Sequence, residues 1–275
     1  MMNHPNVKLF RLLLAVLPAI TYSSCSSDAD SRPEPQPQTW RVSVATGADD
    51  GADDVTRTQL SVSGTTMSAA WQTSDVVQVY KGGSSVGTLS PATATASASL
   101  NGTLTGTFAV NNTLDLYWPS NSPDYSTQDG TLTGTNGISK KDFIEASVTV
   151  QSVDPSNGIL RTTRADFTHR QSFTKFTFST AVKTVKISAT GMSDITVTAS
   201  ADQTVFYVAM PLEGSVEYTF LCTTNAGVEY RGTKTGDLTH GKYYLGSVDI
   251  APGVGVTNTS SWGNNSTENV GNIYF

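Results

Sequence analysis

Apolar residues recur at every second position in many short runs of this chain, and this alternation restricts the fold more than any other feature. Trp40, Val42 and Val44 alternate with Arg41 and Ser43, which is the period of a strand with one buried face. No window shows the apolar period of about 3.6 residues that an amphipathic helix requires. Thr, Ser, Gly and Asn are abundant, as in chains of strands and turns. The sequence therefore predicts an all-β protein.

The amino-terminal half predicts a series of strands separated by polar loops. The expected strands are residues 40–46, 59–62, 76–80, 97–110, 114–118 and 147–153. The pair Asn101 and Gly102 lies inside the fourth of these runs and favours a two-residue hairpin turn there. Residues 119–137 are rich in Ser, Asp, Gly and Thr and are interpreted as a long surface connection. A short helical turn is expected at residues 139–145.

The carboxyl-terminal half predicts short strands at a spacing of roughly 8 to 12 residues, which is typical of a β-sandwich. These strands are residues 173–178, 182–189, 195–199, 204–210, 216–222, 228–231 and 243–250. A turn-like stretch at residues 154–158 places a domain boundary near residue 160. We therefore expect an N-terminal sandwich at 40–160 and a C-terminal sandwich at 161–275, the latter ending in a polar tail.

The amino terminus has the layout of a signal peptide. Lys8 and Arg11 precede the apolar run at residues 12–20, and polar residues resume at Thr21. A membrane-spanning helix needs about 20 apolar residues, so this run is too short to remain as a span. The sequence predicts that residues 1–24 are removed during export.

Cleavage between Ser24 and Cys25 fits a lipoprotein, because residues 22–25 resemble a bacterial lipobox. Acyl chains such as palmitate on Cys25 would bury several tens of methylenes at about 0.8 kcal/mol each, which makes the anchor effectively permanent. Residues 25–39 contain three prolines and are expected to form an extended linker from the outer membrane. The alternative is an ordinary signal peptide followed by an incidental cysteine.

The mature chain is acidic, and this limits its partners. After removal of residues 1–24 it contains 15 basic and 23 acidic residues, a net charge of −8. Such a balance argues against binding nucleic acid through a basic patch. Lipidation of Cys25 would leave Cys222 without a disulfide partner, and the apolar alternation around Cys222 predicts a buried, inert thiol.

Catalytic and cofactor motifs are not found in the sequence. It has no nucleophile elbow, phosphate loop or dinucleotide fingerprint. His169 and His240 lack the spacing of zinc ligands, and the acidic loop at residues 47–54 lacks the distal glutamate of a calcium loop. We therefore expect no metal, no cofactor and no enzymatic activity. A hydrolase whose two carboxylates meet only in space remains a third-ranked alternative.

Three aromatic residues support a different function. Trp71, Tyr117 and Trp118 would form a platform for sugars if their rings were exposed. Each lies in or beside an expected strand, where a core or rim position is the other interpretation. The alternative function is that of an outer-membrane glycan-binding lipoprotein with immunoglobulin-like modules.

Ordered segments along the mature chain carry a family resemblance. They are residues 56–58 (TRT), 71–80 (WQTSDVVQVY), 117–120 (YWPS), 142–146 (DFIEA), 167–176 (FTHRQSFTKF), 243–245 (YYL) and 261–262 (SW). Together they resemble the fimbrillin family, the subunits of type V pili. The resemblance covers nearly the whole mature chain.

The resemblance implies two transthyretin-like (immunoglobulin-like) β-sandwich domains in tandem and a structural or adhesive role in a fimbrium. It also implies that an arginine-specific protease removes the first strand and that a strand from the next subunit, usually from its C-terminal region, fills the groove. Arg57, after the acidic loop, is the matching cleavage candidate, and Arg41 is the alternative. The implied partners are other fimbrial subunits, or ligands on host or bacterial surfaces, and the implied location is the outer membrane and cell surface.

Overall fold

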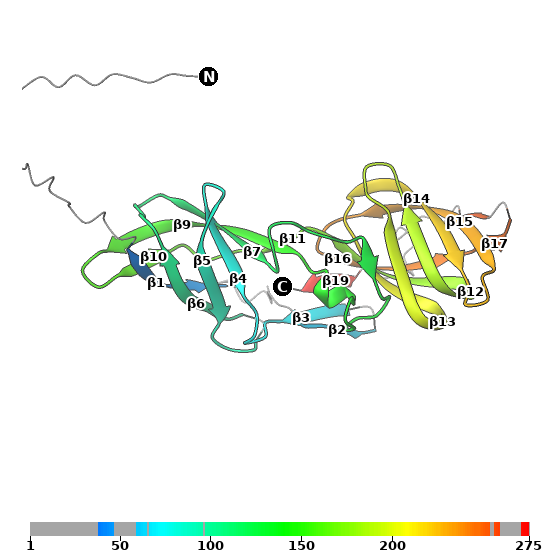
Figure 1. Cartoon of the computed structure of the whole chain (residues 1–275), viewed down its shortest axis with the longest axis horizontal. Helices are drawn as coiled ribbons and strands as arrows, with labels where there is room; N and C mark the ends of the chain where they lie inside the picture. The colour runs from blue at the N-terminus through cyan, green and yellow to red at the C-terminus, as the bar shows by residue number, and fades with distance from the viewer. Residues whose placement is uncertain are drawn as a thin grey trace, which may run out of the picture. The chain divides into compact units, whose positions relative to one another are not determined.

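The computed structural model describes residues 38–46, 59–64, 66–95, 97–253, 256–258 and 271–274. Within these ranges the only helix is the short 3-10 turn η1 (Ile138–Lys140), and every other regular element is a strand (Figure 1). The prediction of an all-β protein is confirmed. No helix of the described ranges is long and apolar enough to cross a membrane.

The first sheet contains eight strands in the order β10-β1-β6-β5-β4-β7-β9-β11. Their bounds are β1 Thr39–Ala45, β4 Val77–Lys81, β5 Ser84–Pro91, β6 Ser99–Thr105, β7 Thr113–Trp118, β9 Ile144–Asp154, β10 Ile159–Thr162 and β11 Thr168–His169. Strand β10 also pairs with β9, which closes all of these strands except β11 into a ring. A sandwich has two separately bonded sheets, so this closed sheet differs from the expected architecture.

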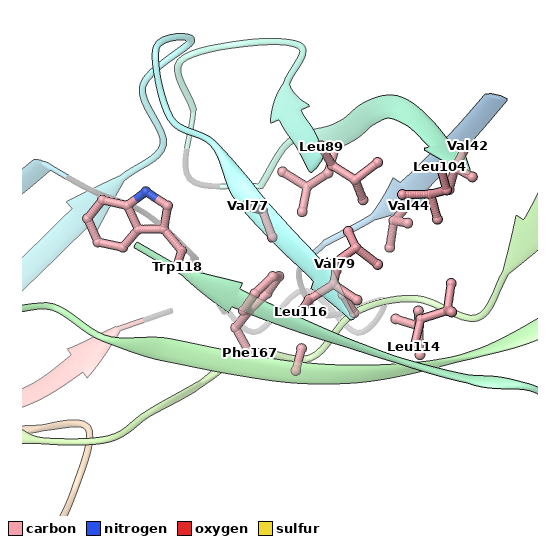
Figure 2. Close-up of a cluster of buried hydrophobic side chains, with 14 of the residues drawn as sticks. Val42, Val44, Val77, Val79, Leu89, Leu104, Leu114, Leu116, Trp118 and Phe167 are labelled. Atoms are coloured by element: carbon pink, nitrogen blue, oxygen red, sulfur yellow. The ribbon is translucent and has the colours of Figure 1, made fainter. Parts of the chain in front are cut away.

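Alternating apolar residues of these strands fill the interior of the closed sheet. Figure 2 shows Val44, Val79, Leu114 and Leu116 pointing into one cluster, together with Phe167. Burial of each such side chain contributes about 1.5–3 kcal/mol relative to exposure. The interior is therefore a packed core, with the polar residues of the same strands on the outer face.

The expected hairpin turn at Asn101 and Gly102 is wrong, because β6 runs straight through both residues. Asn101 pairs with Ser43 of β1 and with Ser90 of β5. A side chain at Gly102 would collide with the carbonyl oxygen of Thr88 in β5. The glycine is present because two strands approach closely there, which is its other common role in a sheet.

The second sheet contains eleven strands, and its main path runs β17-β15-β14-β12-β16-β19-β3-β2. Its bounds are β2 Gln59–Ser63, β3 Thr66–Ala70, β8 Thr127–Gln128, β12 Ser172–Ser188, β13 Ile195–Met210, β14 Gly214–Thr223, β15 Glu229–Leu238, β16 Lys242–Val248, β17 Ala251–Pro252, β18 Val256–Asn258 and β19 Gly271–Tyr274. Strand β13 pairs with β12 and β8, and β18 pairs with β15. A second core cluster, which includes Phe176, Phe206 and Phe220, belongs to this part of the chain.

Two pairs of expected short strands are each one long strand. The expected strands 173–178 and 182–189 both fall on β12, which ends at Ser188, and the expected strands 195–199 and 204–210 both fall on β13. The register between β12 and β13 shifts between Thr177 and Thr184. A bulge of this kind accommodates residues that break the alternation without ending the strand. The sequence alone suggested that the strand ends there.

The expected surface connection at residues 119–137 is partly buried. It contains β8, which pairs with β13. Gln128 is 1% exposed, and its amide both donates to and accepts from the backbone of Ala209, at 3.0 and 2.9 Å. These two bonds satisfy the buried amide and attach the connection to the second sheet.

Strand pairing crosses the expected domain boundary near residue 160 in both directions. The β2–β3 hairpin belongs to the second sheet, and β11 belongs to the first. A third core cluster combines Leu60 and Met67 of this hairpin with Phe173, Ala209 and Tyr243. The division into domains at 40–160 and 161–275 stays a prediction.

Candidate functional site

Strand β1 is the centre of the candidate site, and it lies between two neighbours. It pairs with β6 in antiparallel fashion at seven positions, from Thr39 opposite Thr105 to Ala45 opposite Ser99. It pairs with β10 in parallel fashion at only two, Arg41 opposite Ile159 and Val42 opposite Leu160. The first strand is therefore inside the closed sheet, and its two borders are held very unequally.

The inner face of β1 supplies part of the core. Trp40, Val42 and Val44 are 3%, 5% and 1% exposed. The indole Nε1 of Trp40 donates to the carbonyl oxygen of Gly106 at 2.8 Å, and its ring meets Phe108 edge-on at 6.2 Å. At about 1.5–3 kcal/mol for each buried side chain, loss of β1 would open an apolar slot and remove several kcal/mol of stability.

The pairing between β1 and β10 is short, and a depression lies beside it. A shallow depression is lined by Arg41, Val42, Ser43, Ile159, Leu160 and Arg161. Past it, the next contact of β1 on this side is the bridge from Thr46 to Ala165, whose N–H donates to Ala45 at 2.9 Å. This border, here called the β1–β10 seam, is the weaker of the two.

Both ends of β1 are fixed by side chains. The hydroxyl of Thr46 donates to the carbonyl oxygen of Ala98 at 2.7 Å and accepts from its N–H at 3.1 Å. At the other end Gln38 donates to the carbonyl oxygen of Pro155 at 3.2 Å. The strand is thus held in register along its whole length.

The residues predicted for processing have different outcomes. Ser24, Cys25 and Arg57 lie outside the described residues, so signal cleavage, lipidation and cleavage at Arg57 stay predictions. Arg41 lies within β1, and its N–H donates to the carbonyl oxygen of Gly158 at 2.8 Å. A protease needs an unpaired extended segment, so Arg41 is a poor substrate while β1 is in place.

The three aromatic residues of the alternative function do not lie together on the surface. Trp71 is 0% exposed and Trp118 is 6% exposed. Trp71 packs edge-on against Phe167 at 5.6 Å, and Trp118 belongs to the same core cluster. Buried rings offer no face to a sugar, so of the three only Tyr117, half-buried on the outer face of β7, retains that possibility.

A buried polar network, which no pattern in the sequence predicted, connects two of the segments that carry the family resemblance. His169 Nδ1 lies 2.5 Å from Asp142 Oδ1, and both side chains are fully buried. Gln171 donates to the same Asp142 oxygen at 2.8 Å. The amide oxygen of Gln171 accepts from the N–H of Phe143 at 3.0 Å and from the hydroxyl of Tyr125 at 2.9 Å.

The network is a structural connection rather than a catalytic pair, because no substrate reaches side chains that are fully buried. It joins the segment before β9, the entry to β12 and the 119–137 connection. Burial, and then the charge of Asp142, raises the pKa of Tyr125, so its hydroxyl remains a donor. In the sequence, Asp142 directly precedes Phe143 and His169 follows Phe167 by two residues, but neither spacing predicts a contact between positions 27 residues apart.

No group of three metal-ligating side chains occurs within the ranges that the structure describes. The free thiol of Cys222 is buried, as predicted, and burial raises its pKa to about 12. The thiol is therefore protonated and unreactive in the folded protein.

No protein-family model and no curated protein sequence matches this chain. Among solved structures, a provisionally named cell adhesion protein of Bacteroides uniformis is similar with a TM-score of 0.40 and 14% identity, over 80% of this chain and 94% of its own. The tip fimbrial protein Mfa3 of Porphyromonas gingivalis with a C-terminal truncation is similar with a TM-score of 0.34 and 10% identity, over 78% and 96%. A fimbrial assembly protein of Parabacteroides distasonis gives a TM-score of 0.36 and 11% identity, over 77% and 90%.

Proposed function

We propose that this chain is a structural or adhesive subunit of a surface fibre and that β1 is its exchangeable strand. The observation that supports this most is the position of β1. It is the first described strand in chain order, and it is also an interior strand of a closed sheet. A single cut between Thr46 and β2 would therefore separate β1 from the rest of the chain. The strand that is lost pairs with both of its neighbours and fills part of the core.

The finer proposal is assembly by strand exchange. The chain is exported, anchored at Cys25 to the outer membrane with two transthyretin-like domains at the cell surface, and cut at Arg57. Loss of β1 exposes the backbone of β6 and β10 and the slot vacated by Trp40, Val42 and Val44. A strand from another subunit that alternates apolar residues at the same spacing satisfies both requirements at once.

The unequal borders of β1 support a direction for the exchange. The β1–β10 seam has two paired positions and the β6 border has seven. Parallel pairing is also slightly less stable for each residue than antiparallel pairing. The strand therefore separates first from β10 and last from β6, and an incoming strand pairs first with β10.

A protease experiment tests this function. The mature chain carrying Cys25→Ser, which lacks the lipid, is treated with an arginine-specific protease at low dose. We expect one discrete N-terminal fragment containing β1, followed by a ladder of multimers on a mildly denaturing gel. The Arg57→Lys variant should give neither, and an added peptide of residues 38–46 should suppress the ladder while a scrambled peptide does not. Absence of both fragment and ladder in the parent chain would refute assembly by exchange.

The alternative function, binding of glycans by an outer-membrane lipoprotein, is favoured by one observation. Tyr117 presents part of its ring on the outer face of the first sheet, beside Tyr80 at a centroid distance of 5.6 Å. An adhesive subunit needs a ligand-binding surface in addition to its means of assembly. This residue is where such a surface begins.

A further inference from the structure

Hydrogen-bonding side chains form a row across the outer face of four neighbouring strands. The register places Gln78 of β4 opposite Tyr117 of β7, Tyr117 opposite Glu145 of β9, and Glu145 opposite Thr168 of β11. Residues that lie opposite each other in a sheet share a face and are within contact distance. None of these side chains is buried, so the row faces solvent.

A second row lies beside the first and completes a patch. Tyr80 of β4 is opposite Asp115 of β7, which is opposite Ser147 of β9. A depression within the patch is lined by Tyr117, Glu145, Ala146, Ser147, Asp166 and Thr168. An aromatic ring therefore lies beside a hollow whose other lining residues, apart from Ala146, carry hydroxyl or carboxyl groups.

The aromatic part of this patch is held in a defined orientation. The rings of Tyr80 and Tyr117 meet edge-on with an interplanar angle of 75°. The hydroxyl of Tyr80 donates to Gln78 at 3.0 Å, and the amide of Gln78 donates to the carbonyl oxygen of Pro119 at 3.2 Å. A fixed ring loses little conformational entropy on binding, which favours its use as a contact surface.

Burial, and then the charges of Asp115 and Glu145, raise the pKa of Tyr117. Its hydroxyl is therefore protonated at neutral pH and serves as both donor and acceptor. The half-buried ring and the hydroxyl of Tyr117 together resemble the amphipathic contact that tyrosine supplies at many interfaces.

The charged groups of the patch are already paired within the chain. Glu145 lies 3.5 Å from Arg170, and Asp166 lies 2.5 Å from Arg164. The carboxylate of Asp115 accepts from the hydroxyl of Ser147 at 2.8 Å. A cationic peptide would have to displace these partners, whereas an uncharged ligand rich in hydroxyls adds hydrogen bonds to the remaining lone pairs.

We propose that this patch, the Tyr117 face, binds a neutral saccharide. The apolar face of a sugar ring packs against Tyr117, and its hydroxyls bond to Glu145 and Thr168 at the hollow. The inference rests on the alternative function, glycan binding, and deepens it by naming the class of sugar and the residues that bind it. It is independent of strand exchange, because the Tyr117 face contains no residue of β1. Binding should therefore occur in a single uncut chain.

The test uses the Cys25→Ser chain on an array of neutral, sialylated and sulfated oligosaccharides, followed by titration calorimetry with the best neutral oligosaccharide. We expect neutral saccharides to bind preferentially. Tyr117→Ala should weaken binding at least about tenfold, as for a central aromatic contact. Thr168→Val, at an exposed position that does not support the core, should also weaken it, and Tyr117→Phe should retain most of the affinity.

The matched control is Val110→Ala, which changes a side chain that is 53% exposed and belongs to none of the four strands. It should bind like the parent chain, and thermal unfolding verifies the fold of every variant. Absence of neutral-saccharide binding, preference for anionic sugars, or unchanged binding by both Tyr117→Ala and Thr168→Val would overturn the proposal. The same variants should still form the protease-dependent ladder, so failure of sugar binding is distinguishable from failure of strand exchange.

Discussion

The side chain of Gln171 is fully buried and has hydrogen-bond partners on both its nitrogen and its oxygen. Its nitrogen donates to Asp142 at 2.8 Å, and its oxygen accepts from Phe143 and Tyr125 at 3.0 and 2.9 Å. Burial of an amide whose hydrogen bonds are all made costs little free energy of folding. Its partners, however, would be left without one of their hydrogen bonds if the amide were removed. A single residue thus links the segment before β9, the 119–137 connection and β12.

Gln171→Met tests the importance of this link. The substitution keeps the length of the side chain and removes every hydrogen bond, so Asp142 and the amide of Phe143 lose a buried partner. We expect a loss of about 1–3 kcal/mol in the free energy of unfolding, measured by urea denaturation. Asp166→Ala on the exposed surface should change it by less than about 0.5 kcal/mol. An equally small effect of Gln171→Met would show that the network adds nothing to stability.

At the scale of the strand, β6 shows how one sequence pattern supports two structures. Asn101 and Gly102 carry the pattern of a hairpin turn, yet both lie in a continuous strand with neighbours on each side. A hairpin turn and a close approach of two strands both favour glycine. Which of the two forms depends on whether another strand, here β5, packs against the glycine.

Gly102→Ala should therefore destabilise the protein, although alanine would be tolerated in an ordinary exposed strand position. The added methyl group meets the carbonyl oxygen of Thr88, which belongs to backbone and cannot move without disturbing β5. We expect a loss of about 1–3 kcal/mol in thermal or urea unfolding, the range typical of overpacking. Ser99→Ala in the same strand serves as the control. Stability equal to that of the parent would mean that β5 and β6 are farther apart than described.

The sequence predicted those strands whose burial alternates cleanly, such as β1 and β7. It missed β5, whose residues on both faces are mostly small or polar. It also missed β3 (Thr66–Ala70), which forms a hairpin with β2. It divided β12 because a bulge and a turn look alike in one chain. For the candidate site, β1 was predicted as a strand, but its two neighbours and the Gln171 network depend on residues distant in sequence, which periodicity does not detect.

At the scale of the whole molecule, the carboxyl-terminal segment connects strands from distant parts of the chain. Strands β17 and β18 cover the edge of β15. Strand β19 pairs with β16 on one side, in antiparallel fashion, and with β3 on the other, in parallel fashion. These three strands of the polar tail thus add to sheet borders of their own chain.

Deletion of residues 271–275 tests this connection. The β2–β3 hairpin is joined to the rest of the second sheet through β19. Removal of β19 therefore leaves the hydrogen-bonding borders of β3 and β16 exposed. We expect faster amide hydrogen exchange in residues 59–70 and at Tyr243, because unpaired strand edges open more readily. Exchange in β1 should stay unchanged, since in the described part of the chain β1 pairs with β6 and β10 and has no strand pairing with β3, β16 or β19. Faster exchange throughout the first sheet, or unchanged exchange in the β2–β3 hairpin, would contradict this role. Faster exchange confined to the hairpin and Tyr243 would identify a second border that can accept a strand, between β3 and β16. That border is independent of the slot that β1 fills.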